Sequence, residues 1–304
     1  MKMQYPVRSC AVAAFLLAVL ALASCGPIQK LGVGSNPDFS EGAQQIGDVM
    51  ASIDESGGST GSYGFFNGSS RTFARLVPES LTDKMFKELI GVSSAYADTC
   101  ANTLTFGSCL ASTITRTFGG CTVGPAVITG NITLNFSNAL CQLPNVNDSV
   151  SRAPNFTVTG LRGATLTVTK AGAVGQNITR IAASPAMFSL TNDGIRRKFT
   201  TSTGVVPFDF TTQTTSAMTI TGALRSGRVV NGGILRVTNN VTGTTCDYVP
   251  SAVTWGSSCT CATSGSWSAT CSDGKTSSVI LTGCGTAKVT LGTLSGTMVF
   301  DRCY

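Results

Sequence analysis

Residues Ile132-Thr133-Leu134-Asn135-Phe136 alternate apolar and polar side chains, and this period of two recurs along most of the chain. It continues in Thr165-Leu166-Thr167-Val168-Thr169 and in Phe208-Asp209-Phe210. Successive side chains of a β-strand point to opposite faces, so each run would form a strand with one apolar and one polar face. Antiparallel sheets with one solvated face have this pattern. The sequence therefore predicts a mainly β, antiparallel body over residues 98–304.

Glycine-containing turn signals separate several of the predicted strands. Asn231-Gly232-Gly233 lies between two apolar pairs, and Asp273-Gly274 marks a second such point. These residues adopt positive φ at low cost, which the tight turns of hairpins require. The pattern predicts a hairpin at both places, within either a sandwich or an elongated, partly open barrel.

The first 25 residues have a different composition. Lys2 and Arg8 precede an apolar run over residues 11–22, which is too short to span a bilayer and has the length of a signal-peptide core. Leu22-Ala23-Ser24-Cys25 follows this run and resembles the lipobox of bacterial lipoproteins. The resemblance implies removal of residues 1–24 and attachment of acyl chains, palmitate among them, to Cys25. The alternative is a secretory signal followed by a chance cysteine.

The residue after the cysteine carries a sorting signal in many Gram-negative lipoproteins. By resemblance to that rule, Gly26 implies transfer to the outer membrane, with the body facing either the periplasm or the cell surface. Two or more acyl chains hold a protein stably in a bilayer. The mature part also resembles Cys- and Thr-rich envelope lipoproteins of Gram-negative bacteria, and that resemblance implies no activity.

Two short helical regions are predicted before the β body. Residues 25–70 are rich in Gly, Ser, Asn and Gln and are expected to form a tether. Within it, a stripe of four apolar residues behind a Ser40 cap predicts a weak helix over residues 40–53. A helical region is also predicted at 71–97, from the apolar spacing over residues 79–90. We expect both helices to pack on the protein's own core, and docking on a partner is the alternative.

The chain contains 12 cysteines. Removal of Cys10 with the signal peptide and acylation of Cys25 leave an even number in an oxidising compartment, which is typical of disulfide-bonded proteins. A zinc site made of cysteines alone is the weaker interpretation. The predicted disulfide residues are Cys100, Cys109, Cys121, Cys141, Cys246, Cys259, Cys261, Cys271, Cys284 and Cys303.

Two groups of four cysteines have similar spacing. The group at 100–141 is spaced by 9, 12 and 20 residues, and the group at 261–303 by 10, 13 and 19 residues. This similarity predicts two copies of one module, each with two internal disulfides of the same connectivity. Three connectivities are open within each module. Cys246 and Cys259 would then form the fifth pair.

The composition excludes several classes of function. The chain has no histidine, which excludes Ser-His-Asp and Cys-His catalysis and the common histidine metal sites. Charged residues make up 12% of the chain, and removal of residues 1–24 lowers the net charge from +6 to +4. A nucleic-acid partner would need a stronger basic surface. We therefore expect no metal, no cofactor and no nucleic acid.

A few acidic, basic and aromatic residues support alternative hypotheses of function. Asp209 and Asp247 could form the acid pair of an enzyme that acts on envelope polysaccharide, although nothing in the sequence pairs them. The run Arg196-Arg197-Lys198 could meet anionic lipid headgroups or lipopolysaccharide phosphates, and a solvated turn flank or a charged guard of an edge strand is the simpler interpretation. Trp255 and Trp267 could stack on a sugar, and core packing is the simpler interpretation.

The sequence thus predicts a lipid-anchored envelope protein with a non-catalytic binding or structural role. A protein or glycan partner would bind the β body, and the membrane would be reached through the acyl chains. One alternative is a carrier for lipid or another hydrophobic ligand, built on apolar strand faces that few helices cover. The polysaccharide-acting enzyme is the other.

Overall fold

The computed structural model describes residues 37–56, 109–123, 126–300 and 303. Within them the chain forms one α-helix, α2 (Pro37–Ser56), one 3-10 turn, η3 (Arg225–Gly227), and a single sheet of sixteen strands. The strands are β1 (Thr113–Val123), β2 (Ala126–Phe136), β3 (Ser149–Thr159), β4 (Thr165–Lys170), β5 (Gln176–Ala182), β6 (Met187–Asn192), β7 (Ile195–Thr200), β8 (Phe208–Ser216), β9 (Met218–Thr221), β10 (Val229–Asn231), β11 (Ile234–Asn239), β12 (Thr245–Trp255), β13 (Ala262–Cys271), β14 (Thr276–Gly283), β15 (Thr286–Leu291) and β16 (Leu294–Val299).

Eight of these strands are halves of longer segments. β4 and β5 lie end to end along β3, which pairs with β5 through residues 149–152 and with β4 through residues 155–159. β6 with β7, β8 with β9, and β10 with β11 are arranged in the same way, because both halves pair with the same neighbouring segments. The sheet is therefore a meander in which every long segment is hydrogen-bonded to the segment before it and the segment after it.

The predicted hairpin at Asn231-Gly232-Gly233 is wrong. β10 and β11, on either side of it, do not pair with each other, and both pair with β12. The glycines instead allow a kink inside one long segment, with φ of 69° at Gly232 and 76° at Gly233. A Cβ on Gly233 would lie 2.5 Å from the carbonyl oxygen of Ala217, which separates β8 from β9. The positive φ values that suggested a turn therefore produce a kink within one segment, at a point where two segments approach closely.

The predicted hairpin at Asp273-Gly274 is confirmed. It joins β13 to β14, which pair antiparallel, and the Cys271 amide donates a hydrogen bond of 2.8 Å to the Lys275 carbonyl across the turn. Gly274 has a φ of 80°.

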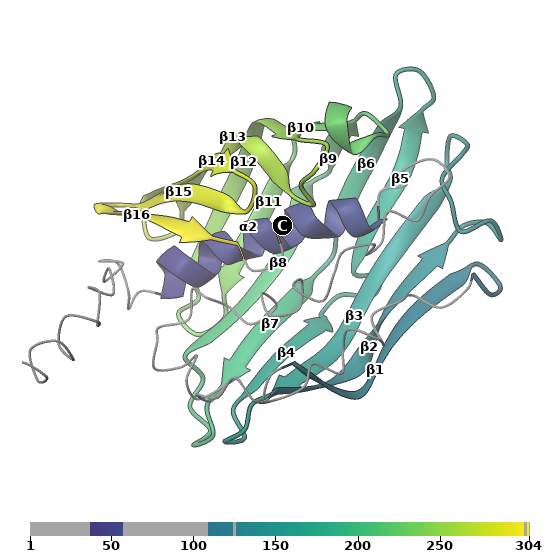
Figure 1. Ribbon diagram of the computed structural model, residues 1–304. Coiled ribbons are helices and arrows are strands. Elements are labelled where there is room, and N and C mark those ends of the chain that lie inside the picture. Colours follow the sequence, from purple (N-terminus) through teal and green to yellow (C-terminus); the bar gives the residue numbers. More distant parts are fainter. Residues whose placement is uncertain (1–36, 57–108, 124–125, 301–302, 304) are drawn as a thin grey trace, which may run out of the picture.

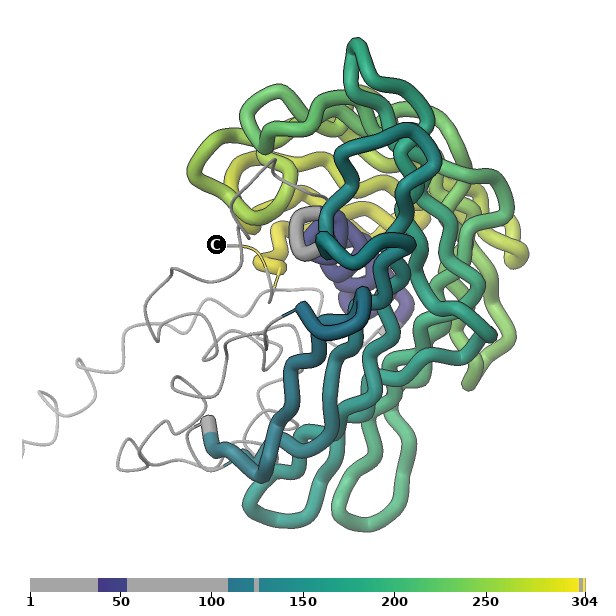
Figure 2. Tube along the Cα trace, turned by 90° about the vertical axis from the view of Figure 1, so that its right-hand side faces the viewer, coloured from purple at the N-terminus to yellow at the C-terminus, as the bar shows by residue number. Residues whose placement is uncertain are grey.

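The sheet curves around α2 (Figures 1 and 2). Its concave face carries the apolar half of each strand, and the largest fully buried side chains include Phe199, Phe208, Phe210 and Trp267. Opposite residues point outward, where register brings hydroxyls side by side, as in Thr129 of β2 beside Thr157 of β3. The mainly antiparallel β class is confirmed, and one continuous curved sheet agrees with the partly open alternative rather than with two stacked sheets.

The helix predicted over residues 40–53 is present, and it is longer than expected. It begins at Pro37 rather than behind Ser40, because proline suits the first helical position, where its missing N–H is not needed. Every side chain from residue 39 to residue 53 is buried except those of Ser40 and Asp48. Residues 37–56 therefore belong to the core of the β body and not to a tether. The rest of the predicted tether and the helical region at 71–97 lie outside the described residues.

The C-terminal end of the chain packs closely on the middle of α2. A Cβ on Gly47 would lie 2.5 Å from Cδ1 and 2.8 Å from Cγ of Phe300, whose side chain is fully buried. The Sγ of Cys261 lies 3.9 Å from the carbonyl oxygen of Gly47. Gly47 thus lets a helix near one end of the chain touch the last residues of the other.

We predict opposite effects for two glycine substitutions in α2. Gly47→Ala should lower the free energy of unfolding by about 1–3 kcal/mol, because Phe300 must shift within a packed core. Gly42→Ala is the control, since its Cβ would meet Phe210 at 3.9 Å, an ordinary contact. It should gain up to about 1 kcal/mol from helix propensity. Urea unfolding of the oxidised proteins measures both, and equal effects would contradict the close approach at Gly47.

Candidate functional site

Four disulfides link eight of the predicted cysteines. They join Cys109 to Cys141, Cys246 to Cys271, Cys259 to Cys284 and Cys261 to Cys303. Cys121 is disulfide-bonded as well. Cys100 and the predicted lipid-attachment residue Cys25 lie outside the described residues.

The prediction of two identical modules is wrong. In the group at 100–141 the second cysteine joins the fourth, whereas in the group at 261–303 the first joins the fourth. The described part of the first group contains two strands, and the second group spans four. The expected Cys246–Cys259 pair is also absent, because Cys246 faces Cys271 directly across the β12–β13 ladder. The similar spacing of the two groups therefore does not reflect a repeated structural unit.

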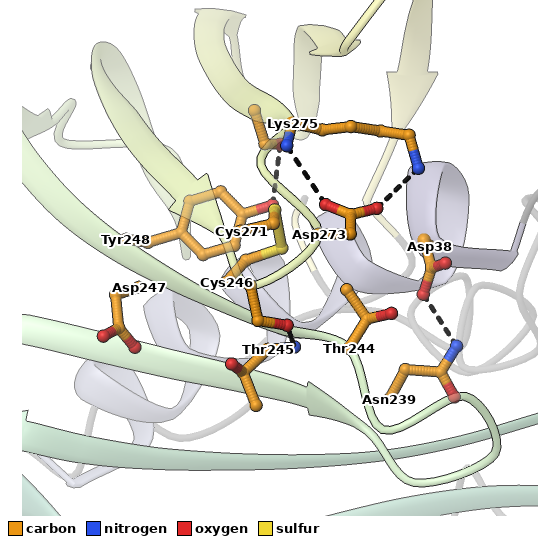
Figure 3. The surroundings of a disulfide bond; sticks show 12 residues. Asp38, Asn239, Thr244, Thr245, Cys246, Asp247, Tyr248, Cys271, Asp273 and Lys275 are labelled. Atoms are coloured by element: carbon orange, nitrogen blue, oxygen red, sulfur yellow. Dashed lines mark hydrogen bonds and ion pairs between the residues drawn. A yellow bond between two sulfur atoms is a disulfide. The ribbon is translucent and has the colours of Figure 1, made fainter.

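Several polar contacts lie around the first turn of α2, near the Cys246–Cys271 disulfide (Figure 3). Asn239, the last residue of β11, donates from Nδ2 to Oδ1 of Asp38 at 2.7 Å. The buried Tyr248 hydroxyl shares a hydrogen bond of 2.8 Å with the Ser277 hydroxyl, and burial raises the pKa of Tyr248. At the adjacent hairpin tip, Lys275 pairs with Asp273. The Asn239–Asp38 hydrogen bond attaches the start of α2 to the sheet, and the other two contacts hold the neighbouring strands and their turn.

A second group of polar contacts joins α2 to the concave face of the sheet. Nη1 of Arg197 is 3.1 Å from Oδ2 of Asp48 on α2, and the two side chains are 4% and 22% exposed. The Arg197 guanidinium also lies 5.9 Å from the centre of the Phe208 ring. Further along the helix, the Ser52 hydroxyl donates to Oε1 of Gln176 on β5 at 2.6 Å. The helix is therefore held by specific polar partners as well as by apolar packing.

The basic run at 196–198 is divided between the two faces of the sheet. Arg197 points inward, while its neighbour Arg196 makes two hydrogen bonds to Asp209 on the outer face. β7 pairs with β4 on one side and β8 on the other, so it is an interior strand. The interpretation of the run as a guard for an edge strand is therefore wrong, and two of its three cations are already paired with carboxylates.

The two acids singled out in the sequence are both ion-paired on the outer face. Burial would raise the pKa of Asp209, but hydrogen bonds from Arg196 and Asn240 outweigh it and the net pKa is lowered. Arg236 makes two hydrogen bonds of 2.7 Å to Asp247 and lowers its pKa. A glycosidase acid needs a raised pKa so that it keeps its proton. Neither residue has the electrostatic environment of a general acid.

Both tryptophans are buried. Trp267 is 0% exposed and Trp255 is 5% exposed. The guanidinium of Arg228 lies 5.7 Å from the centre of the Trp255 ring. Nε1 of Trp255 donates a hydrogen bond of 3.3 Å to the Thr260 carbonyl. Core packing is confirmed for both rings, and neither presents a face on which a sugar could stack.

Comparison of the chain with protein-family models, with curated proteins and with solved structures gave no match. Within the described ranges, histidine, cysteine and acidic residues do not gather in groups of three that could hold a metal ion. No helix in this part of the chain is long and apolar enough to cross a membrane. Functional inference therefore rests on the contacts of the chain itself.

We predict that the inner ion pair stabilises the fold more than the outer one. Asp48→Asn leaves the buried Arg197 guanidinium without its carboxylate and should lower the free energy of unfolding by about 2 kcal/mol or more. Asp247→Asn removes the same charge from an exposed pair and should cost less than about 1 kcal/mol. Urea unfolding of the two variants makes the comparison. A loss at Asp48 no greater than that at Asp247 would contradict a structural role for the inner pair.

The lowered pKa of Asp209 predicts a specific pH dependence. Because its folded pKa lies below the unfolded value of about 3.9, its contribution to stability is present above that pH. The contribution is lost as the pH falls through the folded pKa. The difference in unfolding free energy between wild type and Asp209→Asn should therefore be largest near neutral pH and shrink under acid conditions. Unfolding curves at several pH values test this, and a constant difference would refute it.

Proposed function

We propose that this protein is a lipid-anchored component of the bacterial cell envelope with a non-catalytic binding or structural role. Acyl chains on Cys25 would hold it at the outer membrane, and the curved sheet would form the body that acts. The proposal joins the lipobox resemblance of residues 22–25 to the architecture of the described residues.

The observation that carries the proposal is the burial of α2 inside the sheet. Ile46, Met50 and Ile53 are each 0% exposed, and they occupy the concave face that a hydrophobic ligand would need. Phe300 packs against Gly47 of the same helix, and the Cys261–Cys303 disulfide lies beside it. A helix packed on the concave face favours a role performed by the outer surface over a carrier that encloses its ligand there.

The outer surface carries rows of polar side chains. One row runs across six neighbouring segments, from Asn131 through Asn155, Thr169, Arg196 and Thr211 to Thr238. Such a row offers hydroxyls, amides and a guanidinium at the spacing of adjacent strands, about 4.8 Å. It supports binding of a hydrogen-bonding partner, either a protein or a glycan, in preference to the enzyme alternative, whose candidate acids are held by arginines.

Metabolic labelling tests the anchor. Wild-type protein made in a Gram-negative host with an alkynyl palmitate should carry the label and fractionate with the outer membrane. Cys25→Ala should carry none, because the acceptor thiol is gone. Cys10→Ala is the matched control, since that cysteine lies within the segment to be removed, and it should label like the wild type. Label that persists in Cys25→Ala would overturn the proposal.

Lipid extraction distinguishes the envelope role from the carrier alternative. Protein purified from cells should release no stoichiometric non-covalent lipid on organic extraction, because α2 occupies the concave face. Mass spectrometry of the extract, compared with that of intact acylated protein, provides the measurement. About one free lipid per protein would instead favour the carrier.

A further inference from the structure

Three hairpin tips at one end of the sheet carry exposed aliphatic side chains. Leu161, Val205 and Val241 are 59%, 61% and 55% exposed. They lie in the β3–β4, β7–β8 and β11–β12 connections respectively. β4 pairs with β7 and β8 pairs with β11, so these are successive connections along the same end of the meander. The three tips therefore form one row.

The helix enters the sheet at this same end. Asp38, in the first turn of α2, accepts a hydrogen bond from Asn239, two residues before Val241. Figure 1 shows the β3–β4 and β7–β8 tips on the side of the sheet from which α2 begins. Arg162 follows Leu161 and is also exposed, which places a cation beside the apolar row.

The distance along the chain from the proposed anchor favours this end as the membrane-facing one. Residues 26–36 separate Cys25 from α2, and this length of chain spans at most about 40 Å when fully extended. The segment formed by β8 and β9, residues 208–221, is about 46 Å long at 3.3 Å per residue. A chain of this length is shorter than the segment, so with Cys25 in the bilayer the end of the sheet at which α2 begins is the one that can approach the membrane.

We propose that the tips bearing Leu161, Val205 and Val241 dock on the lipid bilayer and form a second membrane contact beside the acyl chains. The aliphatic side chains enter the boundary between headgroups and acyl chains, and Arg162 meets lipid phosphates. This inference rests on the proposed anchoring at Cys25. It orients the sheet with the start of α2 toward the membrane and the opposite end away from it.

A pair of tryptophan substitutions tests the orientation. Leu161→Trp places a probe at the proposed contact, and Leu224→Trp places one at the other end of the sheet, where the native leucine is equally exposed at 59%. Each full-length acylated protein is reconstituted into vesicles of phosphatidylethanolamine and phosphatidylglycerol that contain brominated phosphatidylcholine. The bromine atoms quench tryptophans that lie at the acyl boundary. The wild type, whose tryptophans are buried, gives the background.

We expect the Leu161→Trp emission to be quenched about twofold more than that of Leu224→Trp, because only the first probe reaches the acyl boundary. Val205→Trp should be quenched like Leu161→Trp. Agreement between the two variants excludes an effect that is confined to one tip. Vesicle flotation of the same samples separates the two proposals. Protein that floats with no difference between the probes keeps the anchor and overturns the docking. Protein that does not float overturns both.

Discussion

The insertion of α2 into the concave face of the sheet is the interaction on which the rest of the structure depends. A meander of this length has a long apolar face that must be covered, and α2 packs on this face against β3, β8, β11 and β15. The helix in turn depends on the sheet, because its buried polar groups need partners there. Asp48 forms an ion pair with Arg197, and Ser52 donates a hydrogen bond to Gln176.

The curvature that encloses the helix is built into the long segments. Four of them are interrupted near their middle, and Gly232 and Gly233 show how an interruption can bring two backbones close together. Interruptions of this kind bend a strand and increase its twist. At the C-terminal end, three disulfides join β12 and the strands and connections that follow it. Cross-links of this kind restrict the unfolded chain and hold the part of the sheet that closes on Gly47.

The distribution of charge agrees with a body whose function lies outside. Each of Asp48, Asp209, Asp247 and Asp273 is paired with an arginine or lysine. For Asp209, Asp247 and Asp273 the pairing lowers the pKa of the carboxyl group, which makes these residues unsuited to donate a proton. The outer face instead carries rows of hydroxyls and amides, and the exposed side chains of Leu161, Val205 and Val241 lie in connections at one end of the sheet. The helix packed on the concave face, the polar rows outside it and the apolar tips beside the start of α2 agree with the proposed anchoring and surface binding.

The alternation of side chains, the turn signal at Asp273-Gly274 and the apolar stripe of residues 40–53 were sufficient to predict an antiparallel β body and a helix before it. These features are local, since each depends on the residues of one element. The cysteine pairing, the kink at Gly232-Gly233 and the ion pair between Asp48 and Arg197 depend on register between segments far apart in sequence. A spacing pattern cannot encode which strands become neighbours or which face a helix covers. The sequence also predicted that this helix packs on the protein's own core, and the burial of α2 confirms it. Only the packed sheet decided which strands the helix contacts, because those contacts are a property of the whole fold.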